Sequence, residues 1–213
     1  MQHQHFREIP STQIYLKGAG IVVNEPSIAA FNNRTNRIIA VGKEAKKMLS
    51  RTPTHITALR PITNGVIADF DMAKEMIQRF LKSEKLPWSW VTQMIVSVPT
   101  NLTEVERKSV EDLLRETGAS RVFLVEQPLV AALGSRLNIY DPTAYLVVDI
   151  GAGTTDMAVI SMNGVVVSNR LKIAGDFLNS EIIRMVREEL KLDIGEPTAE
   201  EIKISAGTAI PQT

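Results

Sequence analysis

Short runs in which hydrophobic and polar residues alternate recur along the chain and predict β-strands, because neighbouring residues of a strand point to opposite faces of its sheet. These runs, many of them rich in β-branched residues, lie at 12–17, 21–24, 27–31, 37–41, 93–98, 121–125, 144–150, 156–161 and 164–171. Two pairs of runs are separated by only a few residues, which predicts antiparallel hairpins at 12–24 and 156–171.

Between the strands, apolar residues recur every three or four positions and predict five amphipathic helices. The helices are expected to begin near residues 71, 103, 127, 176 and 198. Asp71 is the predicted N-cap of the first helix, whereas Thr103 with Glu106, and Thr198 with Glu201, have the spacing of capping boxes. Because helices and strands interleave, the chain is predicted to be an α/β protein with a mixed sheet.

Composition narrows the class of protein. The 213 residues are 44% hydrophobic, which is enough for a substantial core. Lys and Arg together number 24 and so do Asp and Glu, so charge gives no reason to expect nucleic acid as the main partner. The absence of cysteine excludes a disulfide framework and thiolate metal sites, and no apolar run is long enough to predict a membrane span. These features predict a globular cytoplasmic protein.

The sequence LVVDIGAGTTDMAVI at 146–160 places a glycine-rich turn between two strands. Successive backbone N–H groups in such a turn can surround an anion, and glycine lets a ligand approach closely. The hydroxyls of Thr154 and Thr155 can add donors, and Asp149 can hold a hydrated Mg²⁺. The segment therefore predicts a site for the phosphates of a nucleotide.

Two other phosphate-binding motifs are excluded by the context of this turn. It lacks the Lys-Ser/Thr ending of a P-loop, and it leads into a strand where a dinucleotide-binding fold would begin a helix. A purely structural hairpin remains open on these residues alone. The two predicted hairpins also resemble each other, with Thr12 laid over Thr155, which indicates a duplicated unit.

Five motifs follow one another along the chain: VSVPTNLTEVER (96–107), VEQPLVAALG (125–134), DIGAGTTDMAVIS (149–161), IAGDFLNSEI (173–182) and GEPTAEEIK (195–203). In this order they resemble the superfamily of actin, DnaK chaperones and sugar kinases. LKGAGIVVNEPS, VGKEAKKMLSRTP and RPITNGVIADFD resemble most closely the MreB family of bacterial actins, and the likeness spans about residues 12–210. It implies an actin-like (ribonuclease H-like) α/β fold. The first lobe would comprise 1–143, with an inserted subdomain at about 32–68, and 144–213 would be a partial second lobe.

In proteins of this family ATP lies with Mg²⁺ between two lobes, and the resemblance implies where this chain would contact the nucleotide. The second phosphate motif corresponds to Gly151, Ala152, Gly153 and Thr154, and Ala152 stands where the family usually has glycine. The other implied contacts are Asp149, which would hold the metal through water, Thr155, Gly175, Asp176, and Glu200 and Lys203 at the ribose and base.

Gln127 stands where the family places the glutamate that acts on the hydrolytic water, and Thr154 is the second candidate catalytic residue. Glutamine can orient a water but cannot accept its proton, so a slow ATPase is the most that is expected. The family's first phosphate motif, Asp-x-Gly-Thr, is replaced by HFREIPST, and the chain ends before the rest of the second lobe. A truncated form with impaired nucleotide binding is therefore expected.

Both tryptophans, Trp88 and Trp90, lie in KLPWSWVTQ (85–93). The resemblance implies contact with the inner face of the cell membrane, and tryptophan beside lysine suits the lipid interface. Alternatively, one tryptophan anchors the loop in the core. The resemblance also implies a cytoplasmic, membrane-peripheral protein, with further copies, a full-length homologue and membrane-bound cell-wall elongation proteins as partners.

Three functions remain compatible with these residues. The first is an ATP-binding filament protein of the rod-determining cell-shape system. The second is a degenerate interaction module, without hydrolysis, that binds full-length filaments or the membrane. The third, a sugar or acetate kinase, would need a substrate-binding insertion and an acidic base that the sequence does not offer.

Overall fold

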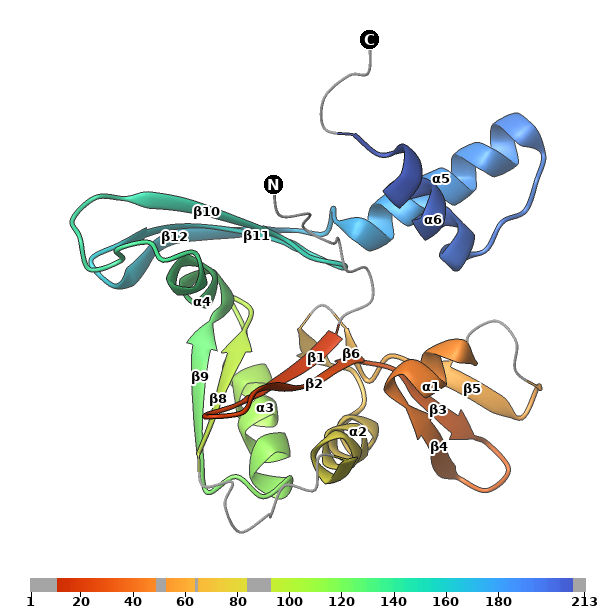
Figure 1. Cartoon of the computed structure of the whole chain (residues 1–213), viewed down its shortest axis with the longest axis horizontal. Helices are drawn as coiled ribbons and strands as arrows, with labels where there is room; N and C mark the ends of the chain where they lie inside the picture. The colour runs from red at the N-terminus through yellow and green to blue at the C-terminus, as the bar shows by residue number, and fades with distance from the viewer. Residues whose placement is uncertain (1–10, 49–52, 64, 84–92, 209–213) are drawn as a thin grey trace.

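The computed structural model describes residues 11–48, 53–63, 65–83 and 93–208. Within these ranges the strands pair in five separate sheets, four antiparallel and one parallel, and not in the mixed sheet predicted. Figure 1 shows the last three strands on the opposite side of helix α4 from strands β8 and β9. The mixture of helices and strands agrees with the predicted α/β class.

The part of the chain before residue 127 combines a hairpin, a parallel strand pair and two long helices. These elements are β1 (Ser11–Leu16), β2 (Gly20–Pro26), α2 (Phe70–Ser83), β8 (Gln93–Val98), α3 (Glu104–Glu116) and β9 (Arg121–Glu126). β1 and β2 are antiparallel, as predicted, and α3 connects the parallel strands β8 and β9. Ala73 of α2 packs with Leu113 and Leu114 of α3 in a buried cluster, so the predicted helix stripes do face a core.

A small sheet is inserted between β2 and α2. Its elements are β3 (Ala29–Asn32), β4 (Arg37–Val41), α1 (Gly42–Lys47) and β5 (Ile56–Leu59), followed by the two-residue strands β6 (Ile62–Thr63) and β7 (Val66–Ile67). β3 is central and pairs with both β4 and β5, and Ile28, Ala30 and Ala45 form the buried core. The sequence pattern predicts neither α1 nor β5 to β7. The unit fills most of the range expected for the inserted subdomain.

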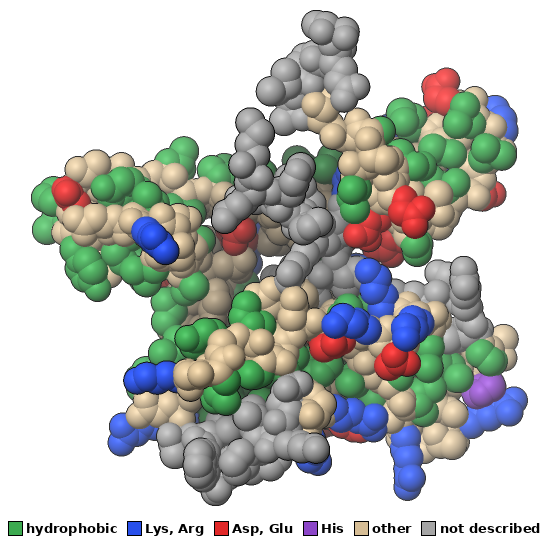
Figure 2. Space-filling model, viewed as in Figure 1, with side chains coloured by type: hydrophobic (Ala, Val, Ile, Leu, Met, Phe, Trp, Pro, Cys, Tyr) green, Lys and Arg blue, Asp and Glu red, His purple; other side chains and the backbone are tan. Residues whose placement is uncertain are grey.

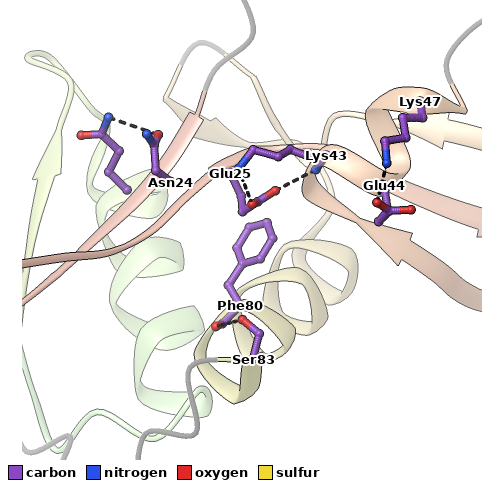
Figure 3. A network of polar contacts seen from close by, with 8 residues as sticks. Asn24, Glu25, Lys43, Glu44, Lys47, Phe80 and Ser83 are labelled. Atoms are coloured by element: carbon purple, nitrogen blue, oxygen red, sulfur yellow. Dashed lines mark hydrogen bonds and ion pairs between the residues drawn. The ribbon is translucent and has the colours of Figure 1, made fainter.

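Helix α1 is attached to β2 through Glu25. The backbone N–H and the Nζ of Lys43 donate to the Glu25 carboxylate at 2.8 and 2.9 Å, and the N–H of Gly42 donates to the carbonyl oxygen of Ile28 at 2.9 Å. Figure 3 shows the ring of Phe80 pointing from α2 toward the same carboxylate. Gly42 has a φ of +64°, so α1 begins in a conformation that favours glycine.

The later part of the chain is a sheet followed by two helices. Its elements are α4 (Gln127–Gly134), β10 (Tyr145–Ile150), β11 (Thr155–Ser161), β12 (Gly164–Leu171), α5 (Gly175–Leu190) and α6 (Glu196–Ala206). The three strands are antiparallel and adjacent in chain order, which includes the second predicted hairpin. Ala132 of α4 is buried with Ile139, Ala158 and Ile160. α4 therefore packs on this sheet although it precedes residue 143, and the division into lobes at that residue stays a prediction.

The start of α3 agrees with the sequence prediction, whereas the start of α2 differs. Thr103 and Glu106 form both hydrogen bonds of a capping box. At the start of α2, the carboxylate of Asp69 accepts a hydrogen bond from the N–H of Met72 at 2.9 Å. The prediction of Asp71 as the cap is therefore wrong, and Asp71 lies within the first turn of the helix.

The second predicted capping box is also wrong. α6 begins at Glu196 with Gly195 as its N-cap, so Thr198 and Glu201 lie inside the helix. Pro197 explains the earlier start, because proline fits the first turn of a helix, where its missing N–H costs no hydrogen bond. None of the described helices combines the length and apolar character needed to cross a membrane.

Candidate functional site

The glycine turn joins β10 to β11 and is closed by an internal hydrogen bond. The N–H of Gly151 donates to the carbonyl oxygen of Thr154 at 2.9 Å, so this amide is used within the turn. The N–H groups of Ala152, Gly153 and Thr154 donate to no acceptor in the part of the chain that the structure describes. Three successive amides of this kind are a donor set suited to an anion.

The start of α5 is hydrogen-bonded to the glycine turn. The N–H of Gly175 donates to the carbonyl oxygen of Gly151 at 3.2 Å, and the N–H of Asp176 donates to that of Ala152 at 2.7 Å. A Cβ atom on Gly175 would lie 3.6 Å from the Cα of Ala152, an ordinary van der Waals contact, so this approach does not itself require glycine. Ala152 is buried and does not have a positive φ, so its methyl group is accommodated. The backbone of Gly175 and Asp176 thus holds the turn.

Both threonine hydroxyls of the turn donate to acceptors within the protein. The Oγ1 of Thr155 donates to the carbonyl oxygen of Ile173 at 2.6 Å, and the Oγ1 of Thr154 donates to Oδ2 of Asp156 at 3.0 Å. In this structure both hydrogens are used within the protein, and the prediction that these hydroxyls add donors for an anion stays a prediction. Asp156 is only 2% exposed and also accepts from Nε of Arg170 at 2.7 Å.

Asp149 and Gln127, which were predicted for different roles, lie in contact. Asp149 is the penultimate residue of β10 and Gln127 is the first residue of α4. The Nε2 of Gln127 donates to Oδ2 of Asp149 at 2.7 Å. Asp149 is also directly opposite Asp156 in the β10–β11 pairing, and residues paired in this way have side chains on the same face. The structure therefore gathers these groups at one end of one sheet.

Arg60, in the segment between β5 and β6, connects the small sheet to α5 and α6. Its Nη1 lies 3.3 Å from Oδ2 of Asp176, and its Nη2 lies 2.6 Å from Oε1 of Glu196. Figure 2 shows acidic side chains below α5 and α6 facing Lys and Arg side chains above the small sheet. Burial raises the pKa of Asp176, Arg60 opposes this, and the negative charges of Glu196 and Glu200 add to it. The Asp176 carboxylate is thus engaged by Arg60.

Glu200 and Lys203 lie one helical turn apart on α6, next to the start of α5. The Nζ of Lys203 donates to the carbonyl oxygen of Gly175 at 3.2 Å, and burial lowers the pKa of Lys203. Glu200 is close enough to Asp176 for its charge to raise the pKa of that carboxyl group. The two residues implied to contact ribose and base therefore border the element that holds the glycine turn.

Three charged residues of this site carry no signal in the sequence pattern. Arg60, Arg170 and Glu196 come from separate segments, and Arg170 also donates from Nη2 to the carbonyl oxygen of Thr100 at 2.8 Å. Their partners are distant in sequence, so no spacing rule indicates them. Asp156 could have been assigned a role, because it directly follows the two threonines of the turn.

Other predicted features lie wholly or mostly outside the described residues. These are Trp88 and Trp90, and the HFREIPST segment up to residue 10. In the described part of the chain, no group of three or more His, Asp or Glu side chains is arranged to hold a metal. Asp149 with water ligands nevertheless fits Mg²⁺, which keeps most of its waters and takes one or two protein carboxylates.

A family model and individual relatives place this chain in the family that the sequence motifs resemble. The family model described as MreB/Mbl protein matches residues 9–213. The cell shape-determining protein Mbl of Bacillus subtilis (strain 168) is 44% identical over 199 residues, which are 93% of this chain and 60% of Mbl. The cell shape-determining protein MreB of Escherichia coli (strain K12) is 44% identical over 208 residues, 94% of this chain and 60% of that protein. The chain thus spans about 60% of the length of these relatives.

Solved structures agree with this result. The crystal structure of MreB 5 of Spiroplasma citri bound to AMPPNP has a TM-score of 0.90 and 36% identity, and the match covers 95% of this chain and 61% of that chain. The MamK double helical filament has a TM-score of 0.72 at 20% identity, covering 88% of this chain and 59% of that chain, which is a likeness of fold alone. The fold is therefore actin-like, as the sequence resemblance implies.

Proposed function

The chain belongs to the MreB/Mbl family, and from this premise we propose that it binds ATP at the glycine turn and acts in actin-like filaments that determine bacterial cell shape. The observation that supports nucleotide binding is the row of three amides at 152–154, which donate to no acceptor among the described residues, with Asp149 beside them. MreB 5 of Spiroplasma citri, which is bound to AMPPNP in its crystal structure, supports the same assignment.

Each group of residues in the proposed site is assigned to one part of the nucleotide or to the metal. The amides of residues 152–154 hold the phosphates, and the Oδ1 of Asp149, which accepts no hydrogen bond from the described residues, holds a water on Mg²⁺. When bound, Mg²⁺ supplies positive charge that offsets the charge of the phosphates. Glu200 and Lys203 of α6 border the ribose and base. Gln127 replaces the family's glutamate, so the proposed ATPase is slow.

Nucleotide binding is tested by titrating a fluorescent ATP analogue into the protein with Mg²⁺. The unchanged chain is expected to bind with a dissociation constant of about micromolar order, and Asp149→Ala is expected to weaken binding about tenfold, because tenfold corresponds to about 1.4 kcal/mol, the size of one charge-assisted contact. The matched control is Asp71→Ala, whose carboxylate is 92% exposed. Equal affinity in both variants would remove Asp149 from the site.

A second function is favoured by the internal contacts of the site. The amide of Gly151, the hydroxyl of Thr155 and the carboxylate of Asp176 are all engaged by other protein groups. A module that has lost nucleotide turnover and binds full-length filaments would tolerate this arrangement. Absence of binding at millimolar nucleotide, together with sedimentation of the chain with filaments of a full-length MreB, would favour this alternative.

The proposed location is the cytoplasmic face of the cell membrane, where filaments of this chain and related proteins would meet membrane-bound cell-wall elongation proteins. The support is the pair of tryptophans in 85–93, with Lys82 and Lys85 beside them. Tryptophan and lysine are favoured where lipid meets water. Head-to-tail contacts between copies would give open filaments, because such contacts do not close on themselves.

The membrane proposal predicts that Trp88→Ala together with Trp90→Ala abolishes sedimentation with vesicles containing anionic lipid. The expected loss is about tenfold or more, because two aromatic side chains would leave the interface. Lys108→Ala is the control, since it changes one charge on the exposed face of α3. Undiminished sedimentation of the double variant would rule out the tryptophan loop as the membrane contact.

A further inference from the structure

The start of α5 fixes the direction of two amides in the glycine turn. The N–H of Gly175 donates to the carbonyl oxygen of Gly151 at 3.2 Å. The N–H of Asp176 donates to the carbonyl oxygen of Ala152 at 2.7 Å. In a trans peptide, the C=O of one residue and the N–H of the next lie in one plane and point in opposite directions. The two hydrogen bonds therefore direct the N–H groups of Ala152 and Gly153 away from α5.

These two amides belong to the row of three that the proposed site offers to phosphate. The N–H groups of Ala152 and Gly153 donate to no acceptor in the part of the chain that the structure describes. Successive amides hold an anion when they converge on it, so their directions matter as much as their number. Any group that fixes the start of α5 therefore also acts on the donors for the anion.

Arg60 holds the start of α5 from a different part of the molecule. It follows β5 of the small sheet, 116 positions before Asp176 in the sequence. Its Nη1 lies 3.3 Å from Oδ2 of Asp176, and its Nη2 lies 2.6 Å from Oε1 of Glu196. Both carboxylates belong to the first turn of their helices. Because the guanidinium is a rigid planar fork, the two contacts fix the starts of α5 and α6 relative to the small sheet.

The charge of Arg60 is placed where carboxylates gather. Burial raises the pKa of Asp176, the charge of Arg60 lowers it, and the charges of Glu196 and Glu200 raise it further. The side chain of Arg60 is only 23% exposed, so solvent screens its ion pairs less than it screens a pair on the open surface. Arg60 therefore draws these acidic helix starts together and toward the small sheet.

We propose that Arg60 is a positioning residue, which couples the small sheet to the glycine turn by holding the start of α5 in place. The inference rests on the proposed ATP site and adds a residue that acts on the phosphates through α5. Coupling between two parts of a protein is reciprocal, so bound nucleotide should in turn hold the small sheet more firmly. A contact that displaces the small sheet should likewise weaken nucleotide binding.

The first test needs no nucleotide and follows amide hydrogen exchange of the whole chain by NMR. In Arg60→Gln, which removes the charge but keeps a polar side chain, the amides of Gly175 and Asp176 are expected to exchange about fivefold faster, because their bonds to the turn open more often. Arg184→Gln is the matched control, since Arg184 also pairs with two carboxylates, but on the exposed side of α5. Unchanged exchange at both amides in Arg60→Gln overturns the positioning role.

Exchanging the charges separates positioning from a general loss of packing. Arg60→Glu adds a further carboxylate and is expected to speed exchange at Gly175 and Asp176 more than Arg60→Gln does. Combining it with Glu196→Arg restores an opposite pair at the same place, so exchange should return to within about twofold of the unchanged chain. A double variant no better protected than Arg60→Glu overturns the proposal. If Arg60→Glu does not fold, Arg60→Lys takes its place: it keeps the charge without the fork, and its exchange should lie between that of Arg60→Gln and that of the unchanged chain.

The second test measures nucleotide affinity with the fluorescent ATP analogue and Mg²⁺. Arg60→Gln is expected to bind about fivefold more weakly, at the lower end of the usual range for coupling between sites. The double variant with exchanged charges should regain most of the affinity. In the unchanged chain, nucleotide should also slow amide exchange in β5, and this effect should be absent from Arg60→Gln.

Failure of the coupling and failure of the proposed function give different results. If the unchanged chain binds ATP and Arg60→Gln binds it equally well, the proposed function stands and the coupling is refuted. If the unchanged chain binds no ATP, the proposed function is refuted, and the ligand-free exchange of Gly175 and Asp176 still decides whether Arg60 positions the turn.

Discussion

Replacing Arg170 with methionine is expected to lower the free energy of unfolding by about 3 kcal/mol, near the lower end of the range for breaking a buried ion pair. Asp156 is 2% exposed and Arg170 is 20% exposed, so the variant leaves an almost fully buried carboxylate without its counter-charge. The hydrogen bond from Thr154 remains but carries no charge to compensate it. Chemical denaturation followed by circular dichroism measures the loss.

The matched control for this prediction is Arg184→Met. Arg184 pairs with Glu181 and Glu188 on the exposed side of α5, where all three side chains are at least 44% exposed. Solvent-exposed pairs contribute about 1 kcal/mol or less, so this variant should be nearly as stable as the unchanged chain. Equal losses in the two variants would contradict the view that the pair of Arg170 with Asp156 is a buried one.

A double variant separates two causes of the lost stability, the unpaired charge of Asp156 and the lost contact of Arg170 with Thr100. Arg170→Met combined with Asp156→Leu removes both charges and fills the space with apolar atoms, which is often neutral for a buried pair. The double variant is therefore expected to be more stable than Arg170→Met alone. If it is no more stable than the single variant, the unpaired charge is not the main cause, and the contact of Arg170 with the carbonyl oxygen of Thr100, which both variants lack, accounts for the loss.

The parts of the fold that the sequence predicts are those whose signal is local. β-strand alternation identifies β8 to β12, because each strand has one face against a core, and the capping box of α3 lies within four consecutive residues. Helix α1 has only six residues, too few for an amphipathic stripe, and Glu25 of β2 accepts the N–H of Lys43 in its first turn. Asp69 and Asp71 are equally good caps by residue type, and the contact with Met72 selects the first.

In the candidate site, too, the features that could be predicted are those whose signal lies within one short segment of the sequence. The glycine turn and Asp149 are contiguous in the sequence, so their chemistry could be predicted from it. The hydrogen bond from Gln127 to Asp149 and the ion pairs of Arg60 depend on how separate elements pack, and no residue spacing encodes them. The ion pair of Arg60 with Oδ2 of Asp176 has no counterpart in the sequence pattern, and the assignment of Asp176 to the nucleotide, which the family resemblance implies, stays a prediction.

Replacing Gly42 with alanine is expected to lower the free energy of unfolding by about 3 kcal/mol. About 1–2 kcal/mol comes from the left-handed conformation, since Gly42 has a φ of +64°. The new methyl group would also overlap Oε2 of Glu25 and lie 3.1 Å from Cε1 of Phe80. Displacing Glu25 leaves the N–H of Lys43, in the first turn of α1, without its acceptor, which costs about 1 kcal/mol, the usual size of a helix cap.

Gly18→Ala separates these two causes, because Gly18 has a φ of +90° but no atom within 4 Å of where its Cβ would lie. This variant should show the conformational cost alone, measured by the same denaturation experiment. A larger loss at Gly42 would therefore measure the attachment of the small sheet to β2 and α2. Equal losses would mean that Glu25 can move aside, and that α1 keeps its position without the contact drawn in Figure 3. The small sheet would then be held to the site mainly by Arg60, whose two ion pairs reach α5 and α6.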